Sequence, residues 1–298
     1  MGSLFDRWDE KIEAFCDYID PYISPIPICM VSFLLFIAFV VEFFVILPYE
    51  IANMGILYGI LVGSLGIYFF FNIYYHLFAC YLAGPGHPEP SQRREICDKC
   101  NNHKPPCASH CSACKRCVLR MDHHCFFLGS CVGLKNHRHF VLFLAYMSAG
   151  SGFAMFAGFS SYWNNLIWRS PEAHFCSIPD VEAPVLGILQ PYLCLSEDLS
   201  LSTIFMIVGV NLLVAGFALG LIIFLWQVPL ISYGTTHVTD MKDTRRAVLS
   251  WRMWDDREMI QRNWEKFLGI NKPGRSFVYD VLLPRYDPPL MEDMLHDE

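Results

Sequence analysis

Four long apolar runs dominate the pattern of hydrophobic and polar positions along this 298-residue chain. They cover about residues 26–48, 54–80, 139–163 and 203–228. Each run reaches the roughly 20 residues that an α-helix needs to cross the apolar core of a bilayer. The first run holds one charge, Glu42, and the second holds no Asp, Glu, Lys or Arg. The pattern therefore predicts four transmembrane helices.

The overall composition agrees with this prediction. Hydrophobic residues make up 54% of the chain and charged residues 17%, and the mean hydropathy is +0.32. Soluble domains rarely have such values, whereas multispanning membrane proteins do. The net charge of −7 carries little information because charge is segregated along the chain, and no basic surplus supports nucleic-acid binding. We expect an all-α polytopic membrane protein.

The polar segments between the apolar runs divide the chain into seven parts. In order these are an N-terminal segment (1–25), helices one and two (26–80), a cysteine-rich loop (81–138), helix three (139–163), a second loop (164–202), helix four (203–228) and a C-terminal tail (229–298). The N-terminal segment is acidic and aromatic, and its loosely helical apolar spacing predicts a short surface helix. It lacks the basic region that a secretory signal places before its apolar core.

Lys and Arg residues indicate the orientation. Of the 22 in the chain, all except Arg169 fall in the N-terminal segment, the cysteine-rich loop and the tail. These three parts lie on one face if the four helices alternate, and the positive-inside rule makes that face cytosolic. The reducing cytosol disfavours disulfides in the cysteine-rich loop. Cys176 and Cys194 would instead lie on the lumenal side, where they could pair.

The stretch from Cys97 to Phe140 holds eight of the thirteen cysteines and six of the eleven histidines. A disulfide framework or bound metal could explain this crowding. The spacing favours metal, because two Cys-x2-Cys pairs can each aim two thiolates at one ion, and tetrahedral zinc then needs two more ligands per pair. The pairs are Cys97 with Cys100 and Cys111 with Cys114, and His110, Cys117, His124 and Cys131 could complete two Cys3His sites. Cys107 and Cys125 are then left over.

Within this setting, the tetrad Asp122-His123-His124-Cys125 resembles the DHHC protein S-acyltransferases, or palmitoyltransferases. The match reads C-x2-C-x9-HC-x2-C-x2-C-x4-DHHC-x5-C-x4-N-x3-F and ends at Phe140. The resemblance implies a cytosolic two-zinc domain between helices two and three, with interleaved ligands. One zinc would take Cys97, Cys100, His110 and Cys117, and the other Cys111, Cys114, His124 and Cys131. Cys125 would stay unligated as the nucleophile.

The same residues suggest a mechanism. A free cysteine has a pKa near 8.5, so only a few per cent is thiolate at neutral pH. His123 is the natural base for Cys125, and Asp122 could orient its imidazole. Acyl-CoA would acylate Cys125, and the acyl group would pass to a substrate cysteine. Leaving the roughly 14 methylenes of a long acyl chain in water forfeits on the order of 11 kcal/mol of burial free energy. A cavity between the membrane helices would bury the chain, and the small residues at 148–154 could line it. The same small residues could instead serve helix packing.

The chain also departs from the family pattern. Phe126 and Phe127 stand where the family usually has Pro-Trp, and Cys107 and Ser130 where it often has Arg and Asn. Thr235-Thr236 matches the start of a Thr-Thr-x-Glu motif whose fourth place here is Val238. Asn263-x3-Phe267-x-Gly269 resembles a C-terminal motif in which the asparagine helps hold the tail against the membrane helices.

Three functions remain open at this point. The first is a protein S-acyltransferase with two structural Zn²⁺ ions and palmitoyl-CoA as co-substrate. Its partners would be the bilayer and membrane-associated proteins with cytosolic cysteines, and its location the endoplasmic reticulum or Golgi. The second is a catalytically silent zinc-binding membrane scaffold, and the third a zinc-dependent binding module without acyl chemistry. Formation of a thioester on Cys125 would distinguish the first from the others.

Overall fold

The computed structural model describes residues 25–89, 96–163, 201–242 and 256–283. The predicted surface helix near the N-terminus and the predicted pair of Cys176 with Cys194 lie outside these residues. Within the described ranges, four helices are long and apolar enough to cross a membrane, judged by length and composition. The chain is thus a multi-pass membrane protein, and the predicted all-α architecture is confirmed.

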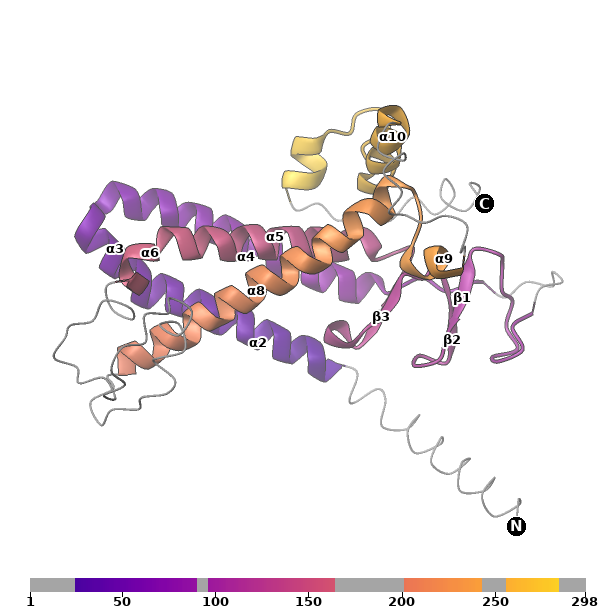
Figure 1. The fold of residues 1–298 in the computed structure, drawn as a ribbon, viewed down its shortest axis with the longest axis horizontal. Helices are drawn as coiled ribbons and strands as arrows, with labels where there is room; N and C mark the ends of the chain where they lie inside the picture. The colour runs from indigo at the N-terminus through magenta and orange to yellow at the C-terminus, as the bar shows by residue number, and fades with distance from the viewer. Residues whose placement is uncertain (1–24, 90–95, 164–200, 243–255, 284–298) are drawn as a thin grey trace, which may run out of the picture. The chain divides into compact units, whose positions relative to one another are not determined.

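The first membrane helix consists of α2 (Pro25–Val41), a π-helical turn η1 (Glu42–Ile46) and α3 (Leu47–Met54). The other three are α4 (Ile56–Ala83), α5 (His137–Ala157) and α8 (Leu201–Ser232), shown in Figure 1. Residues 49–53, between the first two predicted apolar runs, are helical, because α3 continues through them. The break comes at Gly55, whose φ of 90° suits glycine.

The described chain divides into two compact units. One comprises residues 33–73 and 144–223, and its described residues form helices. In it, a buried carboxylate joins α3 to α6 (Phe159–Tyr162): Glu50 accepts hydrogen bonds from the Ser161 backbone N–H and from Ser160 Oγ, each at 2.8 Å. These donors offset the cost of burying the charge.

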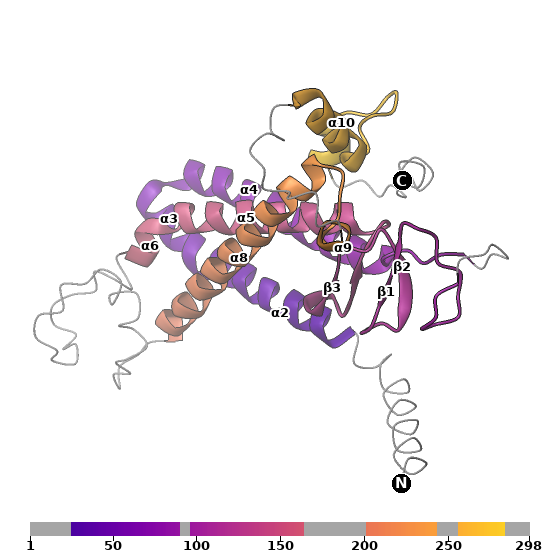
Figure 2. The same cartoon turned by 45° about the vertical axis from the view of Figure 1, so that its right-hand side comes forward.

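Small residues of α5 pack closely within the same unit. A Cβ on Gly150 would lie 3.1 Å from Phe69 Cβ on α4, and a Cβ on Gly220 of α8 would lie 2.6 Å from Ser148 Oγ. Helices α4 and α5 accordingly run side by side in Figures 1 and 2. Close approach of this kind is what small residues allow in membrane helices. Of our two interpretations for residues 148–154, helix packing is the one that these contacts support.

The other unit contains the cysteine-rich region and comprises residues 1–32, 74–143 and 224–298. It contains two short antiparallel hairpins (Figures 1 and 2). In the first, β1 (Ala108–Cys111) pairs with β2 (Arg116–Leu119). In the second, β3 (His123–Cys125) pairs with β4 (Ser130–Val132) across the 3-10 turn η2 (Phe126–Leu128). Strands of three or four residues bury little apolar surface, so this region depends on other contacts for its stability.

The tail of the chain contains α9 (His237–Lys242), α10 (Arg257–Leu268) and a π-helical turn η5 (Val278–Leu282). The Asp256 side chain caps α10 by accepting from the Met259 N–H at 2.9 Å. Asn263 Nδ2 donates to the Ser232 carbonyl at 2.8 Å, which ties α10 to the end of α8. This is the tail contact that the family resemblance implies for Asn263.

Candidate metal clusters and active site

The first Cys3His cluster joins the pair Cys97 and Cys100 to the β1–β2 hairpin. Antiparallel pairing sets His110 directly opposite Cys117. Cys97 Sγ lies 3.6 Å from His110 Nδ1, and Cys100 Sγ lies 3.7 Å from Cys117 Sγ. The four potential ligand atoms all lie within 4.8 Å of one another. These side chains could therefore hold one metal ion.

The second Cys3His cluster joins Cys111 and Cys114 to the β3–β4 hairpin, in which His124 pairs with Cys131. Cys114 Sγ lies 3.3 Å from both His124 Nδ1 and Cys131 Sγ. Cys111 Sγ lies 3.8 Å from the same nitrogen. These four atoms also lie within 4.8 Å of one another, so this cluster could hold a second ion.

The distances in both clusters suit tetrahedral zinc. With Zn–S bonds of about 2.3 Å and Zn–N bonds of about 2.0–2.1 Å, a tetrahedron separates two sulfurs by about 3.8 Å and sulfur from nitrogen by about 3.5 Å. The shorter separations run from 3.3 to 4.0 Å, and every pair within a cluster lies within 4.8 Å. All ten cysteines within the described residues are free of disulfides. The residues present therefore fit two zinc ions, and their ligation of zinc stays a prediction.

Strand geometry explains why neighbouring residues serve different clusters. Successive side chains of a β-strand point to opposite faces. On β1, His110 belongs to the first cluster and Cys111 to the second. On β3, His124 belongs to the second cluster, whereas His123 contacts Asp122. The interleaving that the family resemblance implies thus has a physical basis in the alternation along these strands.

Cys125 stands outside both clusters, at the end of β3, and only 6% of its surface is exposed. The thiol lies close enough to the His123 ring to help raise the pKa of the imidazole. His123 Nδ1 in turn lies 2.8 Å from Asp122 Oδ2. The structure therefore brings together the thiol, imidazole and carboxylate that the sequence nominated as catalytic.

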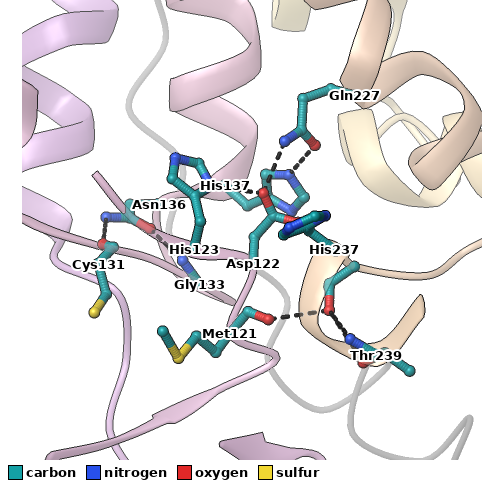
Figure 3. A network of polar contacts seen from close by, with 11 residues as sticks. Met121, Asp122, His123, Cys131, Gly133, Asn136, His137, Gln227, His237 and Thr239 are labelled. Atoms are coloured by element: carbon teal, nitrogen blue, oxygen red, sulfur yellow. Dashed lines mark hydrogen bonds and ion pairs between the residues drawn. The ribbon is translucent and has the colours of Figure 1, made fainter. Parts of the chain in front are cut away.

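The carboxylate of Asp122 is fully buried, and hydrogen-bond donors converge on both its oxygens (Figure 3). Oδ1 accepts from the His237 backbone N–H at 2.8 Å, and Oδ2 accepts from Gln227 Nε2 at 2.7 Å as well as from His123. Gln227 Oε1 accepts from His137 Nε2 at 2.8 Å. Sequence reasoning missed Gln227, His137 and His237. Of these three, only Gln227 could have been found from the sequence, because it is a polar side chain within an apolar membrane run and such residues often have a functional role.

These contacts set the charge states of Asp122 and His123. Burial raises the pKa of Asp122, but the hydrogen bond from His123, the proximity of His137 and the His237 N–H outweigh it and hold the pKa well below its usual range. Burial lowers the pKa of His123, but the hydrogen bond to Asp122 and the contact with Cys125 outweigh it and raise the pKa to about 9. At neutral pH the arrangement favours a carboxylate and an imidazolium beside the Cys125 thiol.

Comparison with known proteins identifies the family. A family model described as DHHC palmitoyltransferase matches residues 90–244, which is just over half of the 298-residue chain. The chain belongs to the DHHC palmitoyltransferase family.

Several curated proteins are similar to parts of this DHHC family member. Palmitoyltransferase PFA3 of Debaryomyces hansenii is 44% identical over 92 residues, which cover 31% of this chain and 23% of the relative. Probable protein S-acyltransferase 12 of Arabidopsis thaliana is 58% identical over 50 residues, 17% of each chain. Palmitoyltransferase ZDHHC16A of Danio rerio is 27% identical over 258 residues, which cover 76% of this chain and 65% of the relative. The chain thus spans less than two thirds of the length of these relatives.

The departure from the DHHC family at Phe126-Phe127 changes the surface of the turn after Cys125. Phe126 is 72% exposed and Phe127 is 48% exposed, and their ring centroids lie 6.1 Å apart. The β3–β4 register is regular beside them, with Cys125 opposite Ser130. The two phenylalanines therefore leave the hairpin that carries Cys125 intact.

The Thr-Thr segment contacts the residues that precede His123. Arg120 Nη2 donates to the Gly234 carbonyl at 2.8 Å, and Thr236 Oγ1 donates to the Met121 carbonyl at 3.0 Å. Val238, which stands where the family has glutamate, packs against the buried cluster of Cys111, Val118, Met121 and Cys131. Residues 234–237 thus contact three successive residues, 120–122. Val238 adds apolar packing to these contacts.

Proposed function

We propose that this DHHC family member is a protein S-acyltransferase that moves a long-chain acyl group, such as palmitoyl, from acyl-CoA to substrate protein cysteines. One observation carries the proposal: Cys125 lies outside both Cys3His clusters and contacts His123, which is hydrogen-bonded to buried Asp122. An inert structural cysteine needs no such partners. Cysteines become nucleophilic beside a positively charged histidine, because the thiolate is then stabilised.

In the first step, the Cys125 thiolate attacks the thioester carbonyl of acyl-CoA. A new carbon–sulfur bond forms to Cys125 Sγ, the bond to the CoA sulfur breaks, and the CoA thiolate takes the proton of the His123 imidazolium. Asp122 stays ionised throughout and holds His123 through Nδ1. Its role is to keep the second ring nitrogen, Nε2, available for proton transfer beside Cys125.

In the second step, neutral His123 accepts the proton of a substrate cysteine. The resulting thiolate attacks the acyl carbonyl on Cys125, the thioester bond to Cys125 breaks, and the Cys125 thiolate returns to its place beside the His123 imidazolium. The two steps predict ping-pong kinetics with a covalent acyl-enzyme. Substrates would be membrane-associated proteins with cytosolic cysteines, since the enzyme itself lies in the bilayer.

The two Cys3His clusters would bind structural zinc. One ion would be held by Cys97, Cys100, His110 and Cys117, and the other by Cys111, Cys114, His124 and Cys131. Zinc bound by four protein ligands supplies folding energy rather than chemistry. Because His124 and Cys131 flank Cys125 on the β3–β4 hairpin, the second ion would hold the nucleophile on a rigid turn.

The distribution of Lys and Arg supports an orientation with both termini and the zinc-binding region in the cytosol. There, acyl-CoA and cytosolic cysteines would both reach Cys125. The membrane would be that of the endoplasmic reticulum or Golgi.

The test is labelling of the purified protein with an alkyne fatty acyl-CoA. We expect one hydroxylamine-sensitive label per chain, lost in Cys125→Ser while zinc content and thermal stability are retained. Cys107→Ser is the matched control, because Cys107 is the other cysteine of the region outside both clusters. The Cys107→Ser protein should still be labelled. Undiminished labelling of Cys125→Ser would refute the assignment, and no labelling of the wild type would favour the scaffold function.

A further inference from the structure

Gln227 and His137 form a buried hydrogen-bonded pair beneath the candidate active site. Gln227 lies near the end of α8 and is 2% exposed, and His137 begins α5 and is 8% exposed. Figure 3 shows the amide of Gln227 between Asp122 and the His137 ring. Its nitrogen Nε2 is 2.7 Å from Asp122 Oδ2, and its oxygen Oε1 is 2.8 Å from His137 Nε2.

The hydrogen-bonding capacities of these groups fix the direction of each bond. An ionised carboxylate only accepts, so Gln227 must turn its NH2 group toward Asp122. The amide oxygen then faces His137, and it can only accept, so His137 must carry a proton on Nε2. A flipped amide would set two oxygens 2.7 Å apart at Asp122 and two nitrogens 2.8 Å apart at His137. Asp122 therefore determines the orientation of the Gln227 amide, and His137 supports that orientation when it carries a proton on Nε2.

The same oxygen of Asp122 also holds His123. Oδ2 accepts from both Gln227 Nε2, at 2.7 Å, and His123 Nδ1, at 2.8 Å. The other oxygen is held by the His237 backbone N–H. If the Gln227 side chain is removed, Oδ2 keeps only the hydrogen bond from His123. The Asp122 carboxylate can then rotate about its hydrogen bonds to His123 and to the His237 N–H. The direction in which His123 presents its ring to Cys125 depends on that oxygen.

We propose that Gln227 and His137 are positioning residues, which act through Asp122 to hold the His123 ring toward Cys125. The proposal rests on the acyltransferase function proposed above. A purely structural alternative exists, in which the Gln227–His137 hydrogen bond only joins α8 to α5. The two differ in whether removing the pair changes the reactivity of Cys125 in a folded, zinc-loaded protein.

The experiment is a double-mutant cycle on the rate of Cys125 self-acylation. Gln227→Met keeps the length of the side chain and removes both hydrogen bonds, whereas His137→Phe keeps a ring against Phe267 and removes only the bond to Gln227. We expect the maximal rate to fall on the order of 10²-fold in Gln227→Met and about tenfold in His137→Phe, since small misplacements have such effects. The acyl-CoA concentration at half-maximal rate should not change. The double variant should lie close to Gln227→Met and well above the product of the two single effects, because His137 acts mainly through its hydrogen bond to Gln227.

Ser232→Ala is the matched control. Ser232 is also buried on α8 and hydrogen-bonded, to Trp264, but it has no contact with Asp122. Its variant should keep the wild-type rate. Retention of the wild-type rate by Gln227→Met, or multiplication of the two single effects in the double variant, would overturn the proposal. If Gln227→Met loses zinc or fails to fold, His137→Phe decides, because Gln227 is then still present.

Alkylation separates this proposal from the proposed function. The rate at which iodoacetamide modifies Cys125, followed by mass spectrometry of its peptide, depends on His123 but needs no acyl transfer. Slower alkylation of Gln227→Met supports the positioning role, even if the wild type forms no thioester and the acyltransferase function fails. Unchanged alkylation and unchanged self-acylation would remove Gln227 and His137 from the mechanism and leave the acyltransferase function standing.

Discussion

Replacing Asp122 with asparagine tests the electrostatic basis of the site. Asp122 accepts hydrogen bonds from His123, Gln227 and the His237 backbone N–H. Asparagine has nearly the same shape, but its NH2 group would face at least one of these donors and leave it unpaired. A buried unpaired donor costs about 1–3 kcal/mol. The charge that stabilises the His123 imidazolium is lost as well.

The size of the effect follows from the pKa of His123. The pKa rises from 6.5 to about 9, which corresponds to about 3 kcal/mol. Asp122 shares this stabilisation with Cys125, so it is an upper bound for Asp122 alone. In Asp122→Asn acyl transfer should therefore fall by roughly 10²–10⁴-fold, because the His123 imidazolium loses its stabilising charge and proton transfer is misdirected.

The assays are single-turnover self-acylation with alkyne palmitoyl-CoA and alkylation of Cys125 by iodoacetamide. Asp280→Asn is the matched control, because Asp280 is equally buried and paired with Arg275, in the C-terminal tail. It should lower stability without changing Cys125 alkylation at pH 7. Equal alkylation and acylation rates for wild type and Asp122→Asn, on zinc-loaded protein, would refute the reasoning.

The same pair predicts a pH dependence of stability. The pKa of His123 is higher in the folded protein than the ordinary value of 6.5, so the pair with Asp122 contributes its full stability below pH 6.5. This contribution is lost as pH rises through about 9. The difference in melting temperature between wild type and Asp122→Asn in detergent should shrink over that range, and a difference that grows with pH would contradict the assignment.

Three further predictions address the neighbouring groups. His124→Ala should lose metal and stability, as measured by elemental analysis and thermal melting. His123→Ala should keep both but lose acyl transfer by roughly 10²–10⁴-fold in the self-acylation assay, with partial rescue at high pH. Equal activity of His123→Ala and wild type would remove His123 from the mechanism. Cys97→Ala should lower zinc from two ions per chain and cause aggregation, and a count of zero or one zinc on folded wild type would refute the two-site arrangement. Asn263→Ala should lower thermal stability by about 0.5–1.5 kcal/mol through loss of the bond to the Ser232 carbonyl, whereas unchanged stability would mean that α10 is held by other contacts.

Local features of the sequence determined a large part of this protein. Four apolar runs of sufficient length identified the membrane helices, because the thickness of the bilayer sets the length of an apolar span. Cys-x2-Cys pairs identified the candidate metal ligands, since that spacing directs two thiolates to one point. The tetrad ending in Cys125 indicated the candidate catalytic groups through its resemblance to the DHHC family. The first two inferences need only residue type and spacing.

Tertiary structure decided what surrounds these groups. Gln227 reaches Asp122 across 105 positions of sequence, and Arg120 reaches Gly234 across 114. No local pattern records such pairs, because they result from the packing of α8 and the following segment against the hairpins. The register of each hairpin sets which histidine faces which cysteine, and that register depends on pairing between strands rather than on either strand alone. His123, which holds the pKa of Asp122 low, is adjacent in the chain, whereas the other groups that lower this pKa, His137 and the His237 N–H, reach Asp122 only through the tertiary structure.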